Sequence, residues 1–225
     1  MGHVNAKASA GLLCLLVVVA ACLFLSAGTS DYWQAWVFLA AFCGAEIAIT
    51  VYLMKRDPRL LERRVKAGPV AEKERRQRII QLIASVGFVG MMILPGLDHR
   101  FGWSTVQPWV SIGGDGLVLL GFLGVFLVFK ENTYASAIIE VGAEQRVIST
   151  GPYAVVRHPM YSAALVMLAG VPLALGSWLG LLPVVPMMAA IVVRLLDEER
   201  FLATNLPGYR EYREKTRYRI APFLW

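Results

Sequence analysis

The feature that most constrains the fold is a series of apolar runs, each close to the length of a membrane-spanning helix. The first two cover residues 10–28 and 34–54, and the next two cover residues 79–97 and 110–129. A helix needs about 20 apolar residues to cross the hydrocarbon core of a bilayer. The runs therefore predict a polytopic membrane protein built from helices.

The composition agrees with a membrane protein. The chain has 225 residues, of which 57% are hydrophobic, and a mean hydropathy of +0.57. In such a protein the net charge of +6 reports loop orientation and contact with anionic lipid, so we expect no nucleic-acid partner. The cysteines Cys14, Cys22 and Cys43 all lie in apolar runs, outside any CxxC or Cys/His cluster, and no metal site is expected.

The first apolar run has two interpretations. Its "VAAC" segment, ending at Cys22, is similar to a lipoprotein cleavage box. The region before the run carries only Lys7, however, and a second apolar run follows at once. These features favour an uncleaved helix over a signal peptide.

Basic residues predict the orientation. The loop at residues 55–78 is strongly basic, which places it in the cytoplasm together with both termini. Two shorter apolar stretches, 160–176 and 178–196, are joined by a tight "GSW" turn and predict a hairpin that begins and ends on the same side. The fourth helix should pack closely, because it contains several glycines: Gly113, Gly114, Gly116, Gly121 and Gly124.

The expected architecture is an all-α integral membrane bundle of about six transmembrane helices with a C-terminal helical hairpin and a cytoplasmic tail. We expect one membrane-embedded domain over residues 1–225. It would comprise an N-terminal helix pair (1–54) and a catalytic core (79–225) with a pocket open to the cytoplasm.

Three polar segments should share the cytoplasmic face: "KENTY" (130–134), "GPYAVVRHPMY" (151–161) and "RLLDEERF" (194–201). A site at this membrane boundary is the simplest interpretation. Glu46 is a further charge, placed inside the second apolar run, where charges are costly and face a partner or a cavity. Its role as a helix–helix contact or a functional group stays open.

The Arg-His-Pro segment lies at the start of the fifth helix, because Pro159 suits the first helical turn. Free backbone N–H groups at that end and the forked guanidinium of Arg157 can bind an anion. Alternatively, Arg157 and His158 extend to the lipid head groups.

In the last cluster, Arg194, Asp197 and Glu198 share one helical face, so that either acid can neutralise the arginine. This group is a structural salt bridge or part of a site. Tyr209 and Tyr212 are spaced to close one side of a pocket, while most of the aromatic and basic tail is typical of a membrane-surface segment.

Taken together, "TGPYAVVRHPMYSA" and the downstream "DEERFLATNLPGYREY" resemble the isoprenylcysteine carboxyl methyltransferases and, more loosely, the membrane phospholipid N-methyltransferases. The shared pattern is an RHP box paired with a Glu-Glu. The resemblance covers residues 130–225, and "DYWQAW" near residue 31 is also similar to bacterial members.

The resemblance implies methyl transfer from S-adenosylmethionine without a Rossmann sheet, a metal or a covalent enzyme intermediate. A lipid-like acceptor would enter from the bilayer, with the carboxylate of a prenylcysteine as the preferred acceptor. Positions that match the cofactor site are Gly151, Pro152, Tyr153, His158, Tyr161, Glu199, Tyr209 and Tyr212. Positions that match the catalytic, acceptor-facing site are Asn132, Arg157, Arg194 and Glu198.

Two alternatives stay open. The acceptor could be a phospholipid amine or a small thiol, which would need a general base such as Glu198 or His158. The chain could instead be a small membrane transporter or binding protein whose path includes Glu46, Arg194 and Glu198. Transport is disfavoured because the sequence has no inverted repeat.

Overall fold

The computed structural model describes residues 2–68, 70–72, 74–142, 144–223 and 225, and these residues form helices but no strands. The six long helices are α1 (Gly2–Ala27), α2 (Trp33–Arg56), α4 (Arg75–Phe101), α5 (Pro108–Glu131), α6 (Pro159–Ala174) and α7 (Val184–Asn205). The short ones are α3 (Pro58–Val65), α8 (Tyr209–Lys215) and the 3-10 turns η1 (Gly151–Ala154) and η2 (Leu179–Leu181). The all-α prediction is confirmed.

Within the described residues, five segments are long and apolar enough to cross a membrane: α1, α2, α4, α5 and the segment Leu179–Asn205 that contains α7. Helix α6 has 16 residues. At 1.5 Å per residue it is about 24 Å long, shorter than the hydrocarbon core of about 30 Å. The chain is thus a polytopic membrane helix bundle, as expected, in which the first arm of the last hairpin is short.

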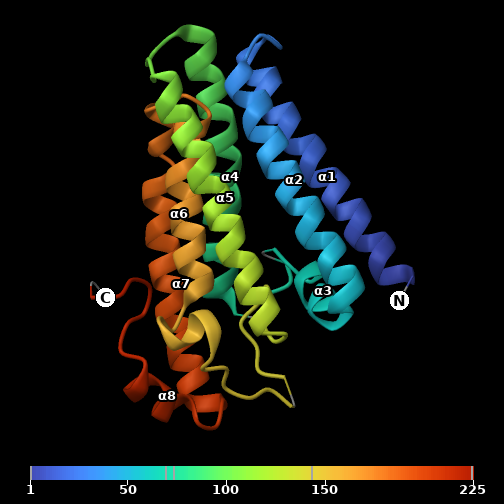
Figure 1. Ribbon diagram of the computed structural model, residues 1–225, viewed down its shortest axis with the longest axis vertical. Coiled ribbons are helices and arrows are strands. Elements are labelled where there is room, and N and C mark those ends of the chain that lie inside the picture. Colours follow the sequence, from blue (N-terminus) through green and yellow to red (C-terminus); the bar gives the residue numbers. More distant parts are fainter. Residues whose placement is uncertain (1, 69, 73, 143, 224) are drawn as a thin grey trace.

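The helices divide the molecule into two ends (Figure 1). The α1–α2, α4–α5 and α6–α7 connections lie at the upper end of the view, whereas α3, the segment 132–158 and α8 lie at the lower end. Helix α1 packs on α4 and α2 packs on α5, so that the N-terminal hairpin leans against the remaining helices. The three polar segments of the sequence consequently gather at one end of the bundle.

Helices α5 and α6 form the most extensive helix pair, and glycine allows their close approach. A Cβ atom added at Gly121 would lie 2.8 Å from Cβ of Met167 and 2.9 Å from the carbonyl oxygen of Ala163. A Cβ atom at Gly114 would collide with the backbone nitrogen of Ala174. Gly113 and Gly116 have no such neighbour within 4 Å, so the packing prediction holds for only part of the glycine-rich face.

The basic segment 55–78 was expected to be a loop, and this expectation is wrong in part, because α3 lies within it. The carboxylate of Asp57 caps the helix by accepting a hydrogen bond of 3.0 Å from the backbone N–H of Leu60, and Pro58 occupies the first turn. Leu60 and Leu61 are buried. A short amphipathic helix of this kind has no long apolar run to reveal it.

The last helix also differs from the prediction of 178–196. Helix α7 begins at Val184, after η2, and continues to Asn205. An apolar run indicates only the part of a helix that lies in lipid. Helix α7 continues beyond that part through the segment 194–200, which is rich in charged residues.

Candidate functional site

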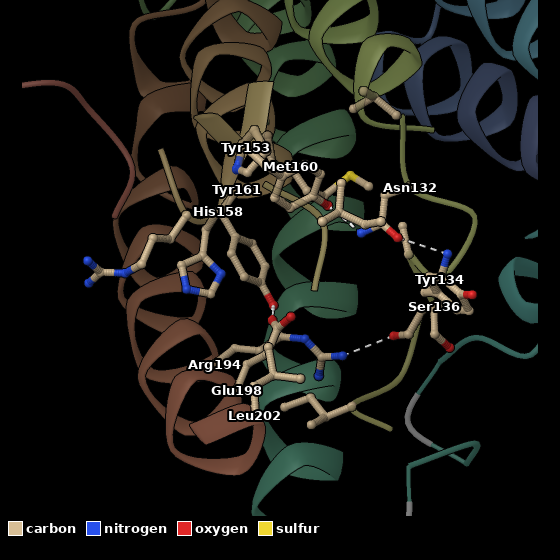
Figure 2. A pocket seen from close by; sticks show the side chains of 18 of the residues that line it. Asn132, Tyr134, Ser136, Tyr153, His158, Met160, Tyr161, Arg194, Glu198 and Leu202 are labelled. Atoms are coloured by element: carbon tan, nitrogen blue, oxygen red, sulfur yellow. Dashed lines mark hydrogen bonds between the residues drawn. The ribbon is translucent and has the colours of Figure 1, made fainter. Parts of the chain in front are cut away.

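A cavity of about 460 Å³ lies at the polar end of the bundle. Its apolar wall comes from α5, α6 and α7 and includes Phe122, Val125, Met167, Leu168, Met187 and Ile191. Its polar wall includes Asn132, Tyr153, His158, Tyr161, Arg194 and Glu198, several of which point into the space (Figure 2). The cavity therefore joins a hydrocarbon-like half to a hydrogen-bonding half.

The Arg-His-Pro segment is placed by a turn and a helix start. Gly151 opens η1 with φ of +56°, a left-handed conformation that L side chains adopt only with strain. An added Cβ atom there would also lie 3.0 Å from the carboxyl carbon of Glu131. Pro159 is the first residue of α6 and His158 is its N-cap, as the sequence predicted.

Glu199 lies at the centre of a buried ionic cluster. Its Oε1 accepts a hydrogen bond of 2.6 Å from Nε of Arg157, and Nε2 of His158 lies 3.3 Å from the same oxygen. Its Oε2 accepts from Nε of Arg219 at 2.9 Å. Arg157 and Glu199 are only 7% and 3% exposed, so each charge depends on the other for compensation.

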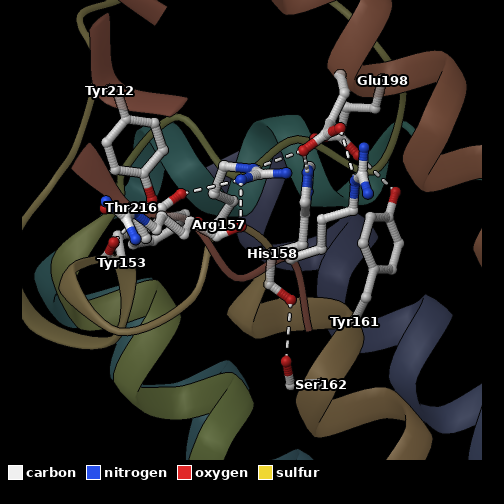
Figure 3. A network of polar contacts seen from close by, with 11 residues as sticks. Tyr153, Arg157, His158, Tyr161, Ser162, Glu198, Tyr212 and Thr216 are labelled. Atoms are coloured by element: carbon white, nitrogen blue, oxygen red, sulfur yellow. Dashed lines mark hydrogen bonds and ion pairs between the residues drawn. The ribbon is translucent and has the colours of Figure 1, made fainter. Parts of the chain in front are cut away.

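Arg157 also holds the C-terminal tail (Figure 3). Its Nη1 donates to the backbone oxygens of Thr216 and Arg217 at 2.9 and 2.7 Å. Its backbone N–H donates to the carbonyl of Tyr218, and that of His158 donates to the carbonyl of Arg219, both at 2.9 Å. The RHP box thus fastens the tail against the start of α6.

Glu198 lies on the cavity side of α7. Its Oε2 accepts a hydrogen bond of 2.6 Å from the hydroxyl of Tyr161, and both residues line the cavity (Figure 2). A carboxylate fixed in this way presents a negative charge beside whatever occupies the cavity.

Arg194 lines the cavity and is neutralised by a carboxylate from the segment between α3 and α4. Its Nη1 forms an ion pair of 2.7 Å with Glu72 and donates to Gln77 at 3.1 Å, while its Nη2 donates to the carbonyl of Ala137 at 2.9 Å. The expectation that Asp197 or Glu198 neutralises Arg194 is therefore wrong. Packing of α4 on α7 brings the segment before α4, which contains Glu72, close to Arg194. Asp197 instead accepts a hydrogen bond of 2.8 Å from Gln77 of α4.

Aromatic residues close the cavity toward α8. Asn132 Nδ2 donates to the hydroxyl of Tyr153 at 2.8 Å, and the hydroxyl of Tyr212 donates to the carbonyl of Tyr153 at 2.7 Å. Burial raises the pKa of Tyr212 to about 12 and raises the pKa values of Tyr153 and Tyr209 further, so all three phenols are neutral near pH 7. The hydroxyl of Tyr209 is buried and has no hydrogen-bond partner among the described residues.

The predicted residues divide into two groups. Those that line the cavity are Asn132, Tyr153, Arg157, His158, Tyr161, Arg194, Glu198, Tyr209 and Tyr212. Gly151, Pro152 and Glu199 lie outside the lining and instead shape η1 or hold Arg157.

Sequence reasoning missed part of the site. Arg64 lines the cavity, and Glu72 and Gln77 hold Arg194. Glu46 also lines the cavity, and its charge inside an apolar run was the available signal. Arg64 gave no comparable signal, because it is one of many basic residues in the segment 55–78.

The acidic, histidine and cysteine side chains do not assemble around a metal. Among the described residues, no group of three or more His, Cys, Asp or Glu side chains comes together in a geometry that could hold an ion.

Comparison with known proteins finds a family model that matches the part of the chain containing most of this site. A curated relative, the cobalt-zinc-cadmium resistance protein CzcN of Cupriavidus metallidurans, is 30% identical over 113 residues, which cover 48% of this chain and 49% of that protein. The chain therefore matches about half of that relative's length. Residues 109–207 match the model of the phospholipid methyltransferase family, and the match includes the RHP box and both glutamates. The resemblance to this group of membrane methyltransferases is thus confirmed over residues 109–207, the part of the chain that matches the phospholipid methyltransferase model.

Proposed function

We propose that the chain transfers a methyl group from S-adenosylmethionine to the carboxylate of a prenylcysteine-like lipidic acceptor at the cytoplasmic membrane boundary. The observation that carries this proposal is the two-sided cavity, in which motif residues of the family, such as Tyr161 and Glu198, face an apolar wall from α5–α7. A lipidic acceptor needs the apolar wall, and the cofactor needs the polar one.

The residues present fit S-adenosylmethionine. A volume of about 460 Å³ lies within the range of about 300–1,000 Å³ that is usual for small-ligand sites. The buried hydroxyl of Tyr209 has no partner among the described residues and can bond a polar ligand. Glu198 and the faces of Tyr153 and Tyr212 offer a negative charge and aromatic rings that suit a sulfonium cation.

When bound, S-adenosylmethionine supplies a methyl group that is already activated on sulfur. The contribution of the protein is mainly orientation and exclusion of water. Tyr161 holds the carboxylate of Glu198 at the cavity, and Asn132 holds the phenol of Tyr153. Arg157 and Glu199 act as positioning residues. By holding the C-terminal tail, they keep Tyr209 and Tyr212 in place at the cavity wall.

The cavity would open to the cytoplasm. Its polar end is the end that carries α3, whose basic residues belong to the segment 55–78. The positive-inside rule assigns such segments to the cytoplasm. We extend the same assignment to both termini, and we treat residues 1–225 as one working domain, because α2 and α3 contribute Glu46 and Arg64 to the cavity.

The second candidate acceptor is the amine of a phospholipid or a small thiol, and the description of the matching family, phospholipid methyltransferase, favours the phospholipid. Such an acceptor must lose a proton, and Glu198 is a base at the cavity wall. His158 is less available for this role, because its Nε2 lies against Glu199.

Calorimetry with S-adenosylhomocysteine, the product of the cofactor, tests the proposal on the detergent-purified chain. We expect saturable binding of S-adenosylhomocysteine to the wild-type chain. Absence of binding at millimolar ligand would reject methyl transfer to either class of acceptor.

A further inference from the structure

The arginines predicted to bind the acceptor already have partners. Arg157 donates to Glu199 and to two backbone carbonyls of the tail. Arg194 is paired with Glu72 at 2.7 Å. Each guanidinium already has a buried carboxylate as its counter-ion, so neither offers an uncompensated positive charge to a ligand.

Arg64 of α3 lines the same cavity and is engaged much less. Its polar contact is a long one, 3.4 Å from Nη1 to the carbonyl of Ser136, and its guanidinium carbon lies 5.1 Å from the ring centre of Phe129. No carboxylate in the described part of the chain lies within 4 Å of it. A guanidinium has five N–H donors, and among the described residues only one protein group accepts a hydrogen bond from Arg64.

The surroundings of Arg64 favour an anion. Burial lowers the pKa of Arg64, the positive charge of Arg194 lowers it further, and Glu46, which also lines the cavity, raises it. The guanidinium has thus lost part of its water without gaining a close counter-ion. The oxygens of an acidic ligand would replace the hydrogen bonds to water that the guanidinium lost on burial.

The neighbouring arginine shows what a structural role looks like on this helix. Arg63 donates to the carbonyl of Thr133 at 3.1 Å and lies 5.0 Å from the ring centre of Tyr134. It fastens α3 to the segment after α5 and is absent from the cavity lining. Arg63 and Arg64 therefore differ in exposure to a ligand although they are adjacent.

We propose that Arg64 anchors the acidic head group, a carboxylate or a phosphate, of an amphiphilic ligand whose tail lies on the apolar wall of the cavity. This inference deepens the proposed function and rests on it, since the ligand would be the methyl acceptor. Arg64 lies outside the matched residues 109–207, so it is a specificity determinant that the N-terminal part of this chain adds to the family region.

The test measures binding of dodecanoate, dodecyl phosphate, dodecanol and dodecylamine to the full chain in dodecyl maltoside by calorimetry, without cofactor. One or both acids should bind about tenfold or more tightly than dodecanol, as a charge-assisted bond to arginine allows. Arg64→Gln should abolish this preference, whereas the control Arg63→Gln should keep it. Whichever acid binds more tightly identifies the head group.

A second variant keeps the test decisive if Arg64→Gln does not fold. Glu46→Gln removes a negative charge from the same wall and should strengthen binding of the acids by about threefold or more. Unchanged or weaker acid binding in this variant, an unchanged preference in Arg64→Gln, or a preference of the wild type for dodecylamine would overturn the proposal.

Failure of the proposed function would be recognised separately. If wild-type protein binds the acids through Arg64 but does not bind S-adenosylhomocysteine, the methyltransferase proposal fails and the anchor stands. If S-adenosylhomocysteine binds equally to wild type and Arg64→Gln while the acids show no preference, the anchor fails alone.

Discussion

Glu198 and Glu199 are consecutive residues of α7 whose carboxylates bind different partners on different sides of the helix. Glu198 accepts from Tyr161 at 2.6 Å in the cavity, and Glu199 accepts from Arg157 at 2.6 Å in the cluster that holds the tail. Successive helical residues are rotated by about 100°, which separates the two groups. Glu198 therefore lines the cavity, whereas Glu199 lies in the ionic cluster that holds the tail.

Glu199→Gln should destabilise the protein strongly. The change leaves the buried guanidinium of Arg157 without its counter-charge, and breaking a buried ion pair costs about 3–5 kcal/mol. The free energy of unfolding, measured by SDS titration in mixed micelles, checks this. Asp197→Asn is the matched control on the same helix. The amide oxygen of asparagine can still accept from Gln77, and the ion-pair partner Arg76 is largely exposed, so this change should cost less than about 1 kcal/mol. Equal effects of the two changes would remove Glu199 from the centre of the cluster.

Arg194→Ala should reduce turnover more than cofactor affinity, and it should also destabilise the fold because Glu72 then remains buried and unpaired. A double-mutant cycle of Arg194→Met and Glu72→Gln, measured as free energies of unfolding, isolates the contribution of this ion pair to stability. The expected coupling energy is about 1–3 kcal/mol. Strictly additive stability changes would show that the pair does not form in the membrane protein.

Much of the site was predictable from sequence because its residues lie in a few segments. Apolar runs defined the helices, the basic segment 55–78 grouped the polar ends, and Pro159 marked the start of α6. These features follow from local chemistry. Their combination predicts that Arg157 and His158 lie close to Arg194 and Glu198 at one end of the bundle, whereas Tyr161 was indicated only by the family resemblance.

Other parts depended on tertiary packing. Spacing along one helix suggested Asp197 or Glu198 as the partner of Arg194, but Glu72 reaches it from the segment before α4. Arg64 reaches the cavity because α3 packs against α1 and α2 at the lower end of the view in Figure 1. The sequence does not predict this packing, since Arg64 is one basic residue among many in its segment. The rotation of α7, which decides the side that Glu199 faces, is likewise set by its neighbours.

Gly114→Ala should disrupt the contact between α5 and α6. The added methyl group would collide with the backbone of Ala174, which cannot move aside as a side chain can. Overpacking of this kind costs about 1–3 kcal/mol, measured by the same SDS titration. Gly113→Ala, one residue away with open space around it, is the control and should be neutral or slightly stabilising. The reverse order would contradict the packing of α5 on α6.

Alkaline pH should destabilise the folded protein through ionisation of Tyr212. Burial raises the pKa of this phenol from 10.0 to about 12, and its hydroxyl donates to the carbonyl of Tyr153. Because the folded pKa is the higher one, the unfolded chain loses the proton first, so the stability from Tyr212 is complete below pH 10 and decreases as the pH rises toward 12. Thermal unfolding from pH 8 to pH 11.5 should show this decrease, and Tyr212→Phe should make it smaller. An identical pH profile in the variant would exclude Tyr212 as the titrating group.

The most direct measurement is transfer of a radiolabelled methyl group from S-adenosylmethionine to N-acetyl-farnesylcysteine by the purified chain, with phosphatidylethanolamine and a simple thiol as parallel acceptors. The account predicts a base-labile methyl ester on the first acceptor, and a rate about 10- to 100-fold lower in Glu198→Gln, as expected for loss of a charged hydrogen-bonding group. Label on the amine or the thiol alone would reject the carboxylate acceptor. No transfer to any acceptor, together with no binding of S-adenosylhomocysteine at millimolar concentration, would contradict methyl transfer itself.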